Sequence, residues 1–311
     1  MGKTVAITGV SSYFASTVLP LLAADPGVDR IVGIDLVPPR TKVPKLSFHA
    51  EDIRSPKLAE ILQGADTLFH LAFVVAEIHD KKKTFDVNIN GSRNVFSAAV
   101  LNGVRKVVYT SSATAYGAHA TNPLCITEER PLTPNQDSYY SLSKFRVESL
   151  AREFFAGHPD TLFTVLRAGL CVGPRTRNMF HGFWTRKASI FPGGRAPHLQ
   201  FIHEEDLGTA LFSVYEKDLP GVYNVASDDA VSSFWVFEKA GVRLLKLPAG
   251  VLKKAANAAF ALRLEKVSQG WLSLSEHTIH MSSEKFKKEA GWAPRWTSEQ
   301  AFLDYLAHRN D

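Results

Sequence analysis

The chain alternates short apolar runs, rich in β-branched residues, with segments of helical spacing, and this alternation constrains the fold more than any single motif. The expected strands are 3–8, 30–35, 45–50, 67–72, 105–112 and 162–167. Continuous apolar strands separated by helices are typical of a parallel sheet that helices cover on both faces. The sequence therefore predicts an α/β fold built on a doubly wound parallel sheet.

The first expected strand runs directly into a tight turn and an apolar helix. Such a turn brings backbone N–H groups and the positive end of a helix against a pyrophosphate, and glycines permit the close approach. Only Gly9 is present, because Ser12 and Ala15 stand where a glycine-rich loop would carry its second and third glycines. We predict cofactor contacts from Gly9, Ser12, Tyr13 and Phe14, although this turn alone does not identify a dinucleotide site.

The second expected strand ends in Asp35, about twenty residues beyond Ala15. An acidic side chain at this place accepts hydrogen bonds from a ribose diol and repels a 2′-phosphate. We therefore predict NAD rather than NADP, although Arg40 and Lys42 lie just downstream and could soften the preference. The alternative is that Asp35 is simply a solvated residue after a strand.

Further residues stand at or just beyond the carboxyl ends of other expected strands, where open α/β sheets bind their ligands. We expect the following residues to surround one crevice: Asp52, Ile53, Leu71, Ala72, Ser111, Ser112 and Gly169. Together these positions predict a Rossmann-type NAD-binding domain over residues 1–169, with a return segment at 200–226. A looser, Gly- and Pro-rich pattern predicts a smaller, interleaved C-terminal substrate region from 170–199 and 227–311.

Tyr140 and Lys144 stand four positions apart, which places both side chains on one face of a helix. A nearby ammonium favours the phenolate, so we expect Lys144 to lower the pKa of Tyr140 from its usual value near ~10. Ser112 could bind the same substrate hydroxyl from a different element. The trio could therefore act in hydride transfer, with Tyr140 as general base.

Composition excludes several classes of protein. The 311 residues, 45% hydrophobic and 22% charged, show ordinary globular usage. The net charge of +5 is spread along the chain and its lysine runs lack interleaved aromatic residues, so we predict no nucleic-acid partner. Cys125 and Cys171 lie far apart, which predicts neither a disulfide framework nor a zinc site and fits a reducing cytoplasm.

The ends and the apolar segments of the chain predict a cytoplasmic protein. The first strand begins at Lys3, which leaves no room for a signal peptide, and no apolar run reaches the ~18 residues of a membrane span. A metal site is not predicted either. His277 and His280 have no nearby carboxylate or cysteine in the sequence that would complete a set of metal ligands. The segment 250–264 has helical spacing with lysines and an arginine; it could lie on a membrane surface, but more often such a helix packs on its own protein.

These motifs, in this order, resemble the extended short-chain dehydrogenase/reductases, and specifically the NAD-dependent epimerase/dehydratase family that includes UDP-glucose 4-epimerase. The resemblance runs nearly end to end. It is carried by T-G-x-x-S-x-x-A, the Asp35 position, Asp52-Ile53, H-L-A, N-I-N-G-S-R-N-V, S-S-A-T-A-Y-G, Y-S-L-S-K, L-R-A-G-L-C-V-G-P, F-I-H-E-E-D and Y-N-V-A. Several motifs in the correct order are far more specific than any one of them.

The resemblance implies roles for particular residues. It implies that Ser112, Tyr140 and Lys144 form the catalytic triad, that Lys144 also holds the nicotinamide ribose, and that Asn88 supports the cofactor site. It implies that Asp52 and Ile53 lie near adenine, and that His203 and Asp206 are structural residues near the base of the substrate cleft. It also implies a homodimer through helices near 85–102 and 140–155.

Two positions depart from the family pattern. Sugar-nucleotide epimerases place an asparagine where this chain has Leu170, and an arginine where it has Leu199. Both family residues touch substrate, and leucine cannot make the bidentate bonds that suit a pyrophosphate. Cations that could compensate from elsewhere are Arg175, Arg177, Arg195 and Lys288.

Three functions follow as hypotheses. The leading one is an epimerase or dehydratase that acts on a sugar nucleotide, using NAD to oxidise a secondary hydroxyl transiently. The second is an NAD-dependent dehydrogenase of a more apolar, sterol-like alcohol, which Leu170, Leu199, Phe180, Phe183 and Trp184 would accommodate. The third is a dinucleotide-sensing protein without turnover, suggested by the two absent glycines.

Overall fold

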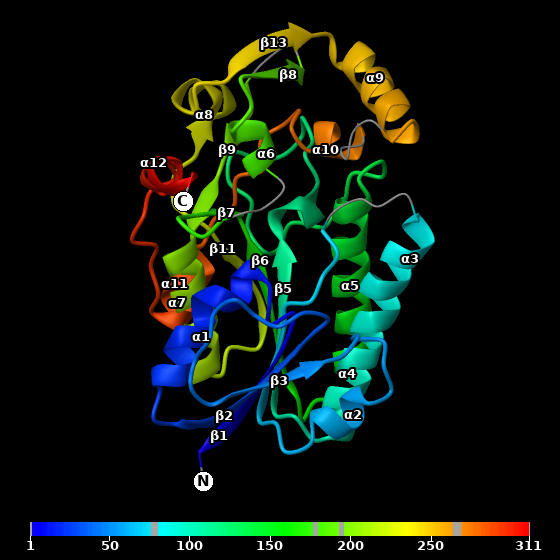
Figure 1. Cartoon of the computed structure of the whole chain (residues 1–311), viewed down its shortest axis with the longest axis vertical. Coiled ribbons are helices and arrows are strands. Elements are labelled where there is room, and N and C mark those ends of the chain that lie inside the picture. The colour runs from blue at the N-terminus through cyan, green and yellow to red at the C-terminus, as the bar shows by residue number, and fades with distance from the viewer. Residues whose placement is uncertain (1, 76–79, 177–179, 193–195, 264–268, 311) are drawn as a thin grey trace.

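The computed structural model describes residues 2–75, 80–176, 180–192, 196–263 and 269–310. A seven-stranded sheet forms the lower body of the molecule in Figure 1, and every neighbouring pair in it is parallel. Its order is β11-β6-β5-β4-β1-β2-β3. The strands are β1 (Lys3–Thr8), β2 (Val28–Asp35), β3 (Leu46–Ala50), β4 (Thr67–His70), β5 (Lys106–Ser112), β6 (Leu162–Ala168) and β11 (Gly221–Val225). The predicted doubly wound parallel sheet is confirmed, with each expected strand present.

The order of the strands reverses between β1 and β4. From β1 the chain winds outward to β2 and β3, and from β4 it winds the opposite way to β5, β6 and β11. Connections on the two sides of this point leave in opposite directions, which opens a crevice at the carboxyl ends of the strands. A ligand that enters the crevice therefore meets the loops after β1 and β4 together.

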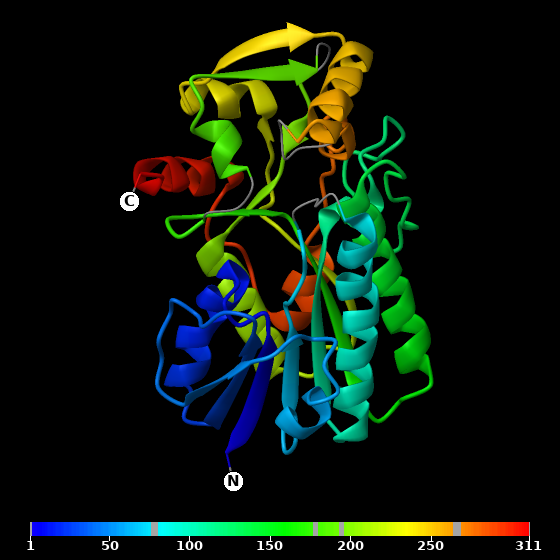
Figure 2. The same cartoon turned by 45° about the vertical axis from the view of Figure 1, so that its right-hand side comes forward.

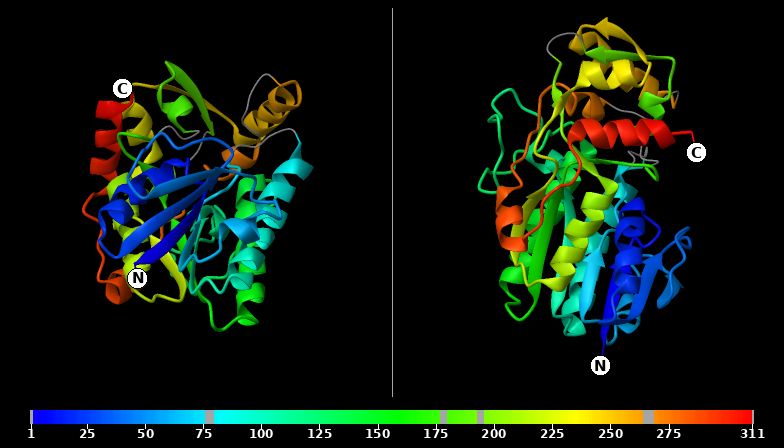
Figure 3. Two further views of the ribbon diagram at one scale, coloured as in Figure 1. Left: turned by 60° about the horizontal axis from the view of Figure 1, so that its bottom comes forward. Right: turned by 90° about the vertical axis from the view of Figure 1, so that its left-hand side faces the viewer.

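Helices cover both faces of the sheet, as Figures 2 and 3 show. One face buries α1 (Tyr13–Ala24), α7 (Glu204–Glu216) and α11 (Glu284–Ala290) in a core with β1 and β11. The other face buries α2 (Leu58–Ile61), α4 (Gly91–Leu101) and α5 (Tyr139–Ala156). A short helix, α3 (Lys81–Phe85), runs into α4 through a π-helical turn at Asp86–Asn90.

The upper part of the molecule carries the short strands and the remaining helices (Figure 1). It contains three strand pairs: β7 (Leu170–Val172) with β10 (Phe201–His203), β9 (His198–Leu199) with β12 (Val231–Ser232), and β8 (Ala188–Pro192) with β13 (Arg243–Leu247). Its helices are α6 (His181–Trp184), α8 (Ser233–Lys239), α9 (Ala249–Ala261), α10 (Gln269–Ser273) and α12 (Ser298–His308). None of the described helices is long and apolar enough to cross a bilayer.

The predicted division into two regions stays a prediction, and the chain crosses between the two parts more often than we expected. The segment 200–226 contributes α7 and β11 to the sheet, which is where the return segment was placed. However, α11 lies within 227–311 and packs against the sheet, where Phe286 joins the same buried core as Tyr223 of β11. Sequence periodicity alone could not show this contact, because it depends on a pairing distant in the chain.

A buried ion pair fastens α5 to the sheet. Glu148 on α5 accepts hydrogen bonds from the guanidinium of Arg167 on β6, and both side chains are almost fully buried. Arg167 also donates to the hydroxyl of Tyr116, which in turn contacts the side-chain amide of Asn224 on β11 at 2.9 Å. A charge removed from this network would leave its partner buried without compensation.

We predict that Arg167→Ala destabilises the protein by about 3–5 kcal/mol, because it leaves the Glu148 carboxylate buried and unpaired. Arg152 provides the matched control: it lies 3.8 Å from the same carboxylate but is 69% exposed. Arg152→Ala should cost about 0–1 kcal/mol. Urea denaturation of both variants measures the difference, and similar losses in the two would contradict the assignment.

Candidate functional site

A cavity of about 530 Å³ lies at the carboxyl ends of the central strands. Its floor comes from the sheet domain, including Ser12 on the first turn, Ser112 after β5 and Gly169 after β6. Its roof comes from the upper part of the molecule, including Phe183 on α6 and Phe237 on α8. Of the residues expected around one crevice, Leu71, Ser111, Ser112 and Gly169 line this space. The others, Asp35, Asp52, Ile53 and Ala72, are not among its described lining residues.

The first turn approaches the end of β4 closely. Gly9 has a φ of 73°, and a Cβ placed on it would lie 2.5 Å from the backbone nitrogen of Ala72. Both constraints select glycine, since a side chain is disfavoured by the left-handed conformation and by the contact. Leu71 and Ala72, which follow β4, thus lie directly against the turn.

Helix α1 begins at the rim of the cavity. Ser12 is its N-cap, and its hydroxyl accepts a hydrogen bond from the N–H of Ala15 at 3.2 Å. The N–H groups of Tyr13 and Phe14 belong to the first turn of the helix, where no intrahelical acceptor exists. Together with the positive end of the helix dipole, they form a site suited to a pyrophosphate.

Asp35 lies at the end of β2 and is oriented by the first turn. Its carboxylate accepts hydrogen bonds from the N–H of Ser11 at 3.0 Å and from the N–H of Leu36 at 2.7 Å. A carboxylate can accept about four hydrogen bonds, so capacity remains for the diol of a ribose. The side chain is half-buried beside the turn, which is the placement that an NAD site requires.

Asp52 and Asn88 make contacts with the protein itself. The Asp52 carboxylate pairs with Arg54 at 2.7 Å, and Arg54 pairs with Asp86 at 2.8 Å. The hydrogen bond from Arg54 lowers the pKa of Asp52. Asn88 accepts from the N–H of Val74 at 2.8 Å and donates to its carbonyl at 3.1 Å, so it holds the loop after β4 in place. Ile53 is buried, and its backbone carbonyl accepts from Asn94.

The three residues predicted to carry the chemistry meet in the cavity. Ser112 ends β5, while Tyr140 and Lys144 lie on the first two turns of α5, and all three line the space. The Ser112 side chain lies close enough to Tyr140 to lower the pKa of its hydroxyl. The Nζ atom of Lys144 donates to the carbonyl of Thr110 at 2.8 Å and lies 3.6 Å from the centre of the Phe73 ring.

The electrostatics differ from what we expected from sequence. Burial raises the pKa of Tyr140 to about 12, and the Ser112 side chain offsets only part of this shift. Burial also lowers the pKa of Lys144 to about 7, against an opposing effect of Glu148. The expectation that Lys144 would lower the pKa of Tyr140 is wrong for this structure. The ammonium is itself desolvated, so near neutral pH it is only partly charged.

Two aromatic residues around Tyr140, Trp271 and Phe73, were not predicted from the sequence, whereas Phe180 was expected to accommodate an apolar substrate. Trp271 on α10 stacks on the Tyr140 ring, with centroids 5.3 Å apart and planes inclined by 22°. Phe73 meets the same ring edge to face at 5.7 Å, and Phe180 meets Trp271 at 5.6 Å. These residues lie far apart in the chain and belong to no recognisable motif, so only the folded arrangement brings them together.

The residues predicted to bind substrate fall into three groups. Leu170 and Leu199 both line the cavity. Arg175 is not among its described lining residues; its Nε donates to Glu204 at 2.7 Å and its Nη1 to the carbonyl of Ser16 at 3.2 Å. Arg195, like Arg177, lies outside the residues that the structure describes.

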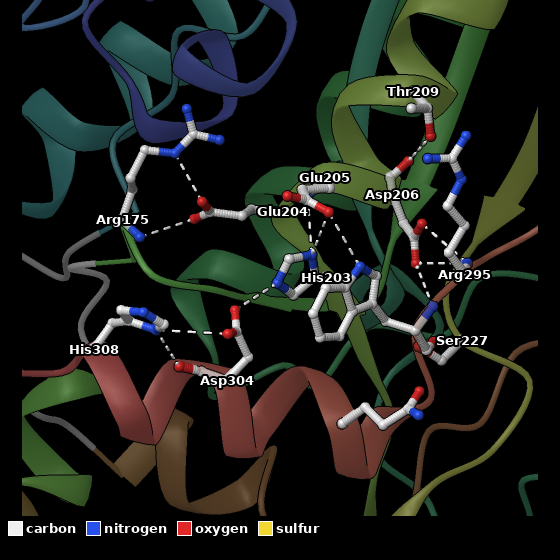
Figure 4. Close-up of polar contacts among 12 residues, drawn as sticks. Arg175, His203, Glu204, Glu205, Asp206, Thr209, Ser227, Arg295, Asp304 and His308 are labelled. Carbon is white, nitrogen blue, oxygen red and sulfur yellow. Dashed lines mark hydrogen bonds and ion pairs between the residues drawn. The ribbon is translucent and has the colours of Figure 1, made fainter.

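The F-I-H-E-E-D segment makes polar contacts with Arg175 and with the C-terminal part of the chain (Figure 4). His203 contacts Asp304 of α12 at 3.0 Å, and Glu204 pairs with Arg175. Asp206 accepts from the backbone N–H of Arg295 at 3.0 Å. These contacts tie the C-terminal segment to the start of α7. No group of three or more acidic, His or Cys side chains among the described residues could hold a metal ion.

The described residues fit NAD on three observations. The Gly9 turn leaves no room for a β-carbon, the first turn of α1 offers N–H donors, and Asp35 retains acceptor capacity. In addition, the hydroxyl of Ser111 is buried in the cavity wall without a hydrogen-bond partner among the described residues. A buried orphan hydroxyl of this kind is suited to a polar group of a ligand.

The chain is similar to known proteins over most of its length. A family model described as NAD dependent epimerase/dehydratase family matches residues 5–226. Uncharacterized protein y4nG of Sinorhizobium fredii is 27% identical over 323 residues, covering 99% of this chain and 80% of that protein. UDP-glucose 4-epimerase 2 of Oryza sativa is 30% identical over 185 residues, covering 53% of this chain and 44% of that enzyme.

Solved structures share the fold. UDP-glucuronic acid 4-epimerase from Bacillus cereus, in complex with UDP-glucuronic acid and NAD, superimposes with a TM-score of 0.80. The match covers 99% of each chain at 17% sequence identity. At this identity the likeness concerns the fold alone.

We predict that Gly9→Ala destabilises the protein more than Gly103→Ala does. Gly103 also has a positive φ, 62°, but no described atom lies within 4 Å of a Cβ built there. Gly103→Ala should therefore cost only the conformational strain of about 1–2 kcal/mol. Gly9→Ala adds the collision with the Ala72 backbone, and urea denaturation will compare the two; equal losses would show that the turn can open freely.

We also predict a pH signature of the buried amine. The folded pKa of Lys144, about 7, lies below the value near ~10.4 of a free lysine. Between these values the unfolded chain binds a proton that the folded chain does not, so the wild type gains stability relative to Lys144→Met as the pH rises from 7 to 9. Denaturation at both pH values tests this, with the exposed Lys83→Met as a control that should show no such gain.

Proposed function

The chain belongs to the NAD dependent epimerase/dehydratase family, whose enzymes are of the extended short-chain dehydrogenase type. On this premise we propose that it oxidises a secondary hydroxyl of its substrate, with Tyr140 as the general base. The observation that carries the proposal is the meeting of Ser112, Tyr140 and Lys144 in one cavity beside the Gly9 turn. A base, a hydroxyl donor and a dinucleotide site within one space are the components that such a hydride transfer needs.

In the proposed reaction the Tyr140 phenolate oxygen takes the proton of the substrate hydroxyl and becomes a phenol, while the Ser112 hydroxyl positions the oxygen that loses the proton. Bound NAD supplies the hydride acceptor and a positively charged ring that favours the phenolate. Lys144 donates a hydrogen bond to the Thr110 carbonyl, which fixes helix α5 to strand β5 beside the site. In its protonated form Lys144 also adds positive charge near Tyr140. In an epimerisation or dehydration Tyr140 later returns its proton to the substrate, so the residue ends in its starting state.

A sugar nucleotide is the first substrate candidate. Membership of the family supports it, and so does the rice relative, whose name describes it as a UDP-glucose 4-epimerase. The contact that this candidate needs is a cation for the diphosphate. Four cations were proposed for that role. Arg175 pairs with Glu204, Lys288 is not among the described lining residues of the cavity, and Arg177 and Arg195 lie outside the described residues.

An apolar secondary alcohol is the second candidate, and the lining of the cavity favours it. Lys144 is the one Lys or Arg among the described lining residues, which include no Asp or Glu. The walls instead offer Leu170 and Leu199 together with the aromatic side chains of α6 and Trp271. Such a surface suits a large apolar ring system better than a diphosphate.

Ligand-induced stabilisation separates the two candidates. A compound that binds only the folded protein raises its unfolding temperature by mass action. Stabilisation by UDP, and not by a hydroxysteroid, would support the sugar nucleotide, and the reverse result would support the apolar alcohol. Mass spectrometry of the small molecules released on denaturation provides an independent identification of both cofactor and substrate.

We predict that Tyr140→Phe lowers hydride transfer by about 10²- to 10⁴-fold, the usual contribution of a general base, and leaves NAD bound. Tyr139→Phe is the matched control, because the Tyr139 hydroxyl donates to the carbonyl of Lys81 rather than to a group in the cavity. Turnover of the substrate that ligand stabilisation selects, and the NAD content of each variant, are the readouts. Unchanged turnover in Tyr140→Phe would remove Tyr140 from the reaction.

A further inference from the structure

The top of the molecule exposes an apolar strand face. Strands β8 and β13 pair in parallel, with Leu245 directly opposite Ile190, so both side chains lie on the same face of the pair. Ile190 is 46% exposed, Leu245 is 48% exposed, and Leu247 follows on the same face. The opposite face is the one that packs inward, where Phe191 contacts Phe234 and Phe237 of α8.

Helix α9 continues this surface directly from β13 and packs beside β8 at the top of Figures 1 and 2. Its inner side buries Leu252. Its outer side carries a stripe of four exposed apolar residues: Val251, Ala255, Ala258 and Leu262. Their spacings of four, three and four place them on one face of the helix. Val251 is 56% exposed and Leu262 is 70% exposed. The helix is therefore apolar on both sides, and only one side has a partner among the described residues.

Cations predominate among the described charged residues around this surface. The sequences 180–192 and 243–263 contain no acidic residue. Exposed cations within them are Arg186, Lys187, Arg243, Lys254 and Arg263. The nearby carboxylates are Glu238 on α8 and Glu276, and Glu276 pairs with Lys253 at 2.9 Å. Exposed leucine and valine side chains surrounded by cations are complementary to a partner that has an apolar layer beneath a layer of negatively charged groups.

The same surface borders the cavity. Ser189, Ile190 and Phe191 of β8 are all lining residues of the cavity, so the strand that carries the exposed Ile190 also forms part of the cavity wall. An apolar compound held at this surface would lie next to the site that contains Tyr140.

We define the apical face as Ile190, Leu245, Leu247, Val251 and Leu262 with the cations Arg243, Lys254 and Arg263, and we propose that it binds the surface of an anionic phospholipid bilayer. The apolar side chains enter the boundary between headgroups and acyl chains, while the cations contact lipid phosphates. The protein lies on the bilayer and does not span it. This contact does not depend on turnover, so it can fail without affecting the proposed reaction, and the reverse also holds.

Sedimentation with vesicles tests the proposal on the full chain. We expect the protein to bind vesicles of phosphatidylcholine containing phosphatidylglycerol, to bind phosphatidylcholine alone far less, and to be released by high salt. Leu262→Glu should weaken binding by about tenfold or more, because a leucine no longer enters the apolar layer. Lys254→Gln should weaken it by about fivefold, the contribution of one cation near an anionic surface.

Leu101→Glu is the matched control, since Leu101 on α4 is 76% exposed and lies away from the apical face. It should bind vesicles as the wild type does, and unfolding temperatures verify that both variants fold. Equal binding by the wild type and Leu262→Glu, or no binding to anionic vesicles, would overturn the proposal. The proposal would also be overturned if the wild type were a dimer and Leu262→Glu were a monomer that still binds vesicles. The apical face would then be an interface between two copies of the chain.

Discussion

The position of helix α5 depends on two buried basic side chains, Lys144 and Arg167. They attach α5 to the sheet at two points that lie one helical turn apart, Lys144 and Glu148. Lys144 donates to the carbonyl of Thr110 on β5, and the Glu148 carboxylate receives Arg167 from β6. An ion pair out of contact with water holds its geometry only when every partner is present. Since Tyr140 lies one turn before Lys144 on the same face of α5, the position of its hydroxyl relative to Ser112 follows from these two attachments.

Local sequence predicted the parts of the site that depend on local geometry. The strand pattern placed Ser112 and Asp35 at the carboxyl edge of the sheet, and the four-residue spacing placed Tyr140 and Lys144 on one face of a helix. The stack of Trp271 on Tyr140 could not be predicted, because it joins elements that are distant in the chain. The pKa shifts of Tyr140 and Lys144 depend on burial, which the spacing of residues does not report.

The apolar cavity creates a tension between family and site. A rice relative of this chain is named as a UDP-glucose 4-epimerase, whereas the described walls here carry leucines and aromatic rings around one buried amine. A low-polarity site also makes each charge costly, and this cost is what moves the pKa of Tyr140 upward and that of Lys144 downward. The same low polarity that would admit an apolar alcohol therefore determines the protonation of the residues that would act on it.

The π-helical turn at Asp86–Asn90 constrains the number of residues between α3 and α4. Asn88 lies within it and clamps the backbone of Val74 through both atoms of its amide. Each residue of an α-helix advances the side chains by about 100° around the axis. Deleting a single residue from the turn would either swing Asn88 away from Val74 or rotate all of α4 against the sheet. Insertions and deletions, tolerated in most surface loops, would thus be strongly disfavoured in these five residues.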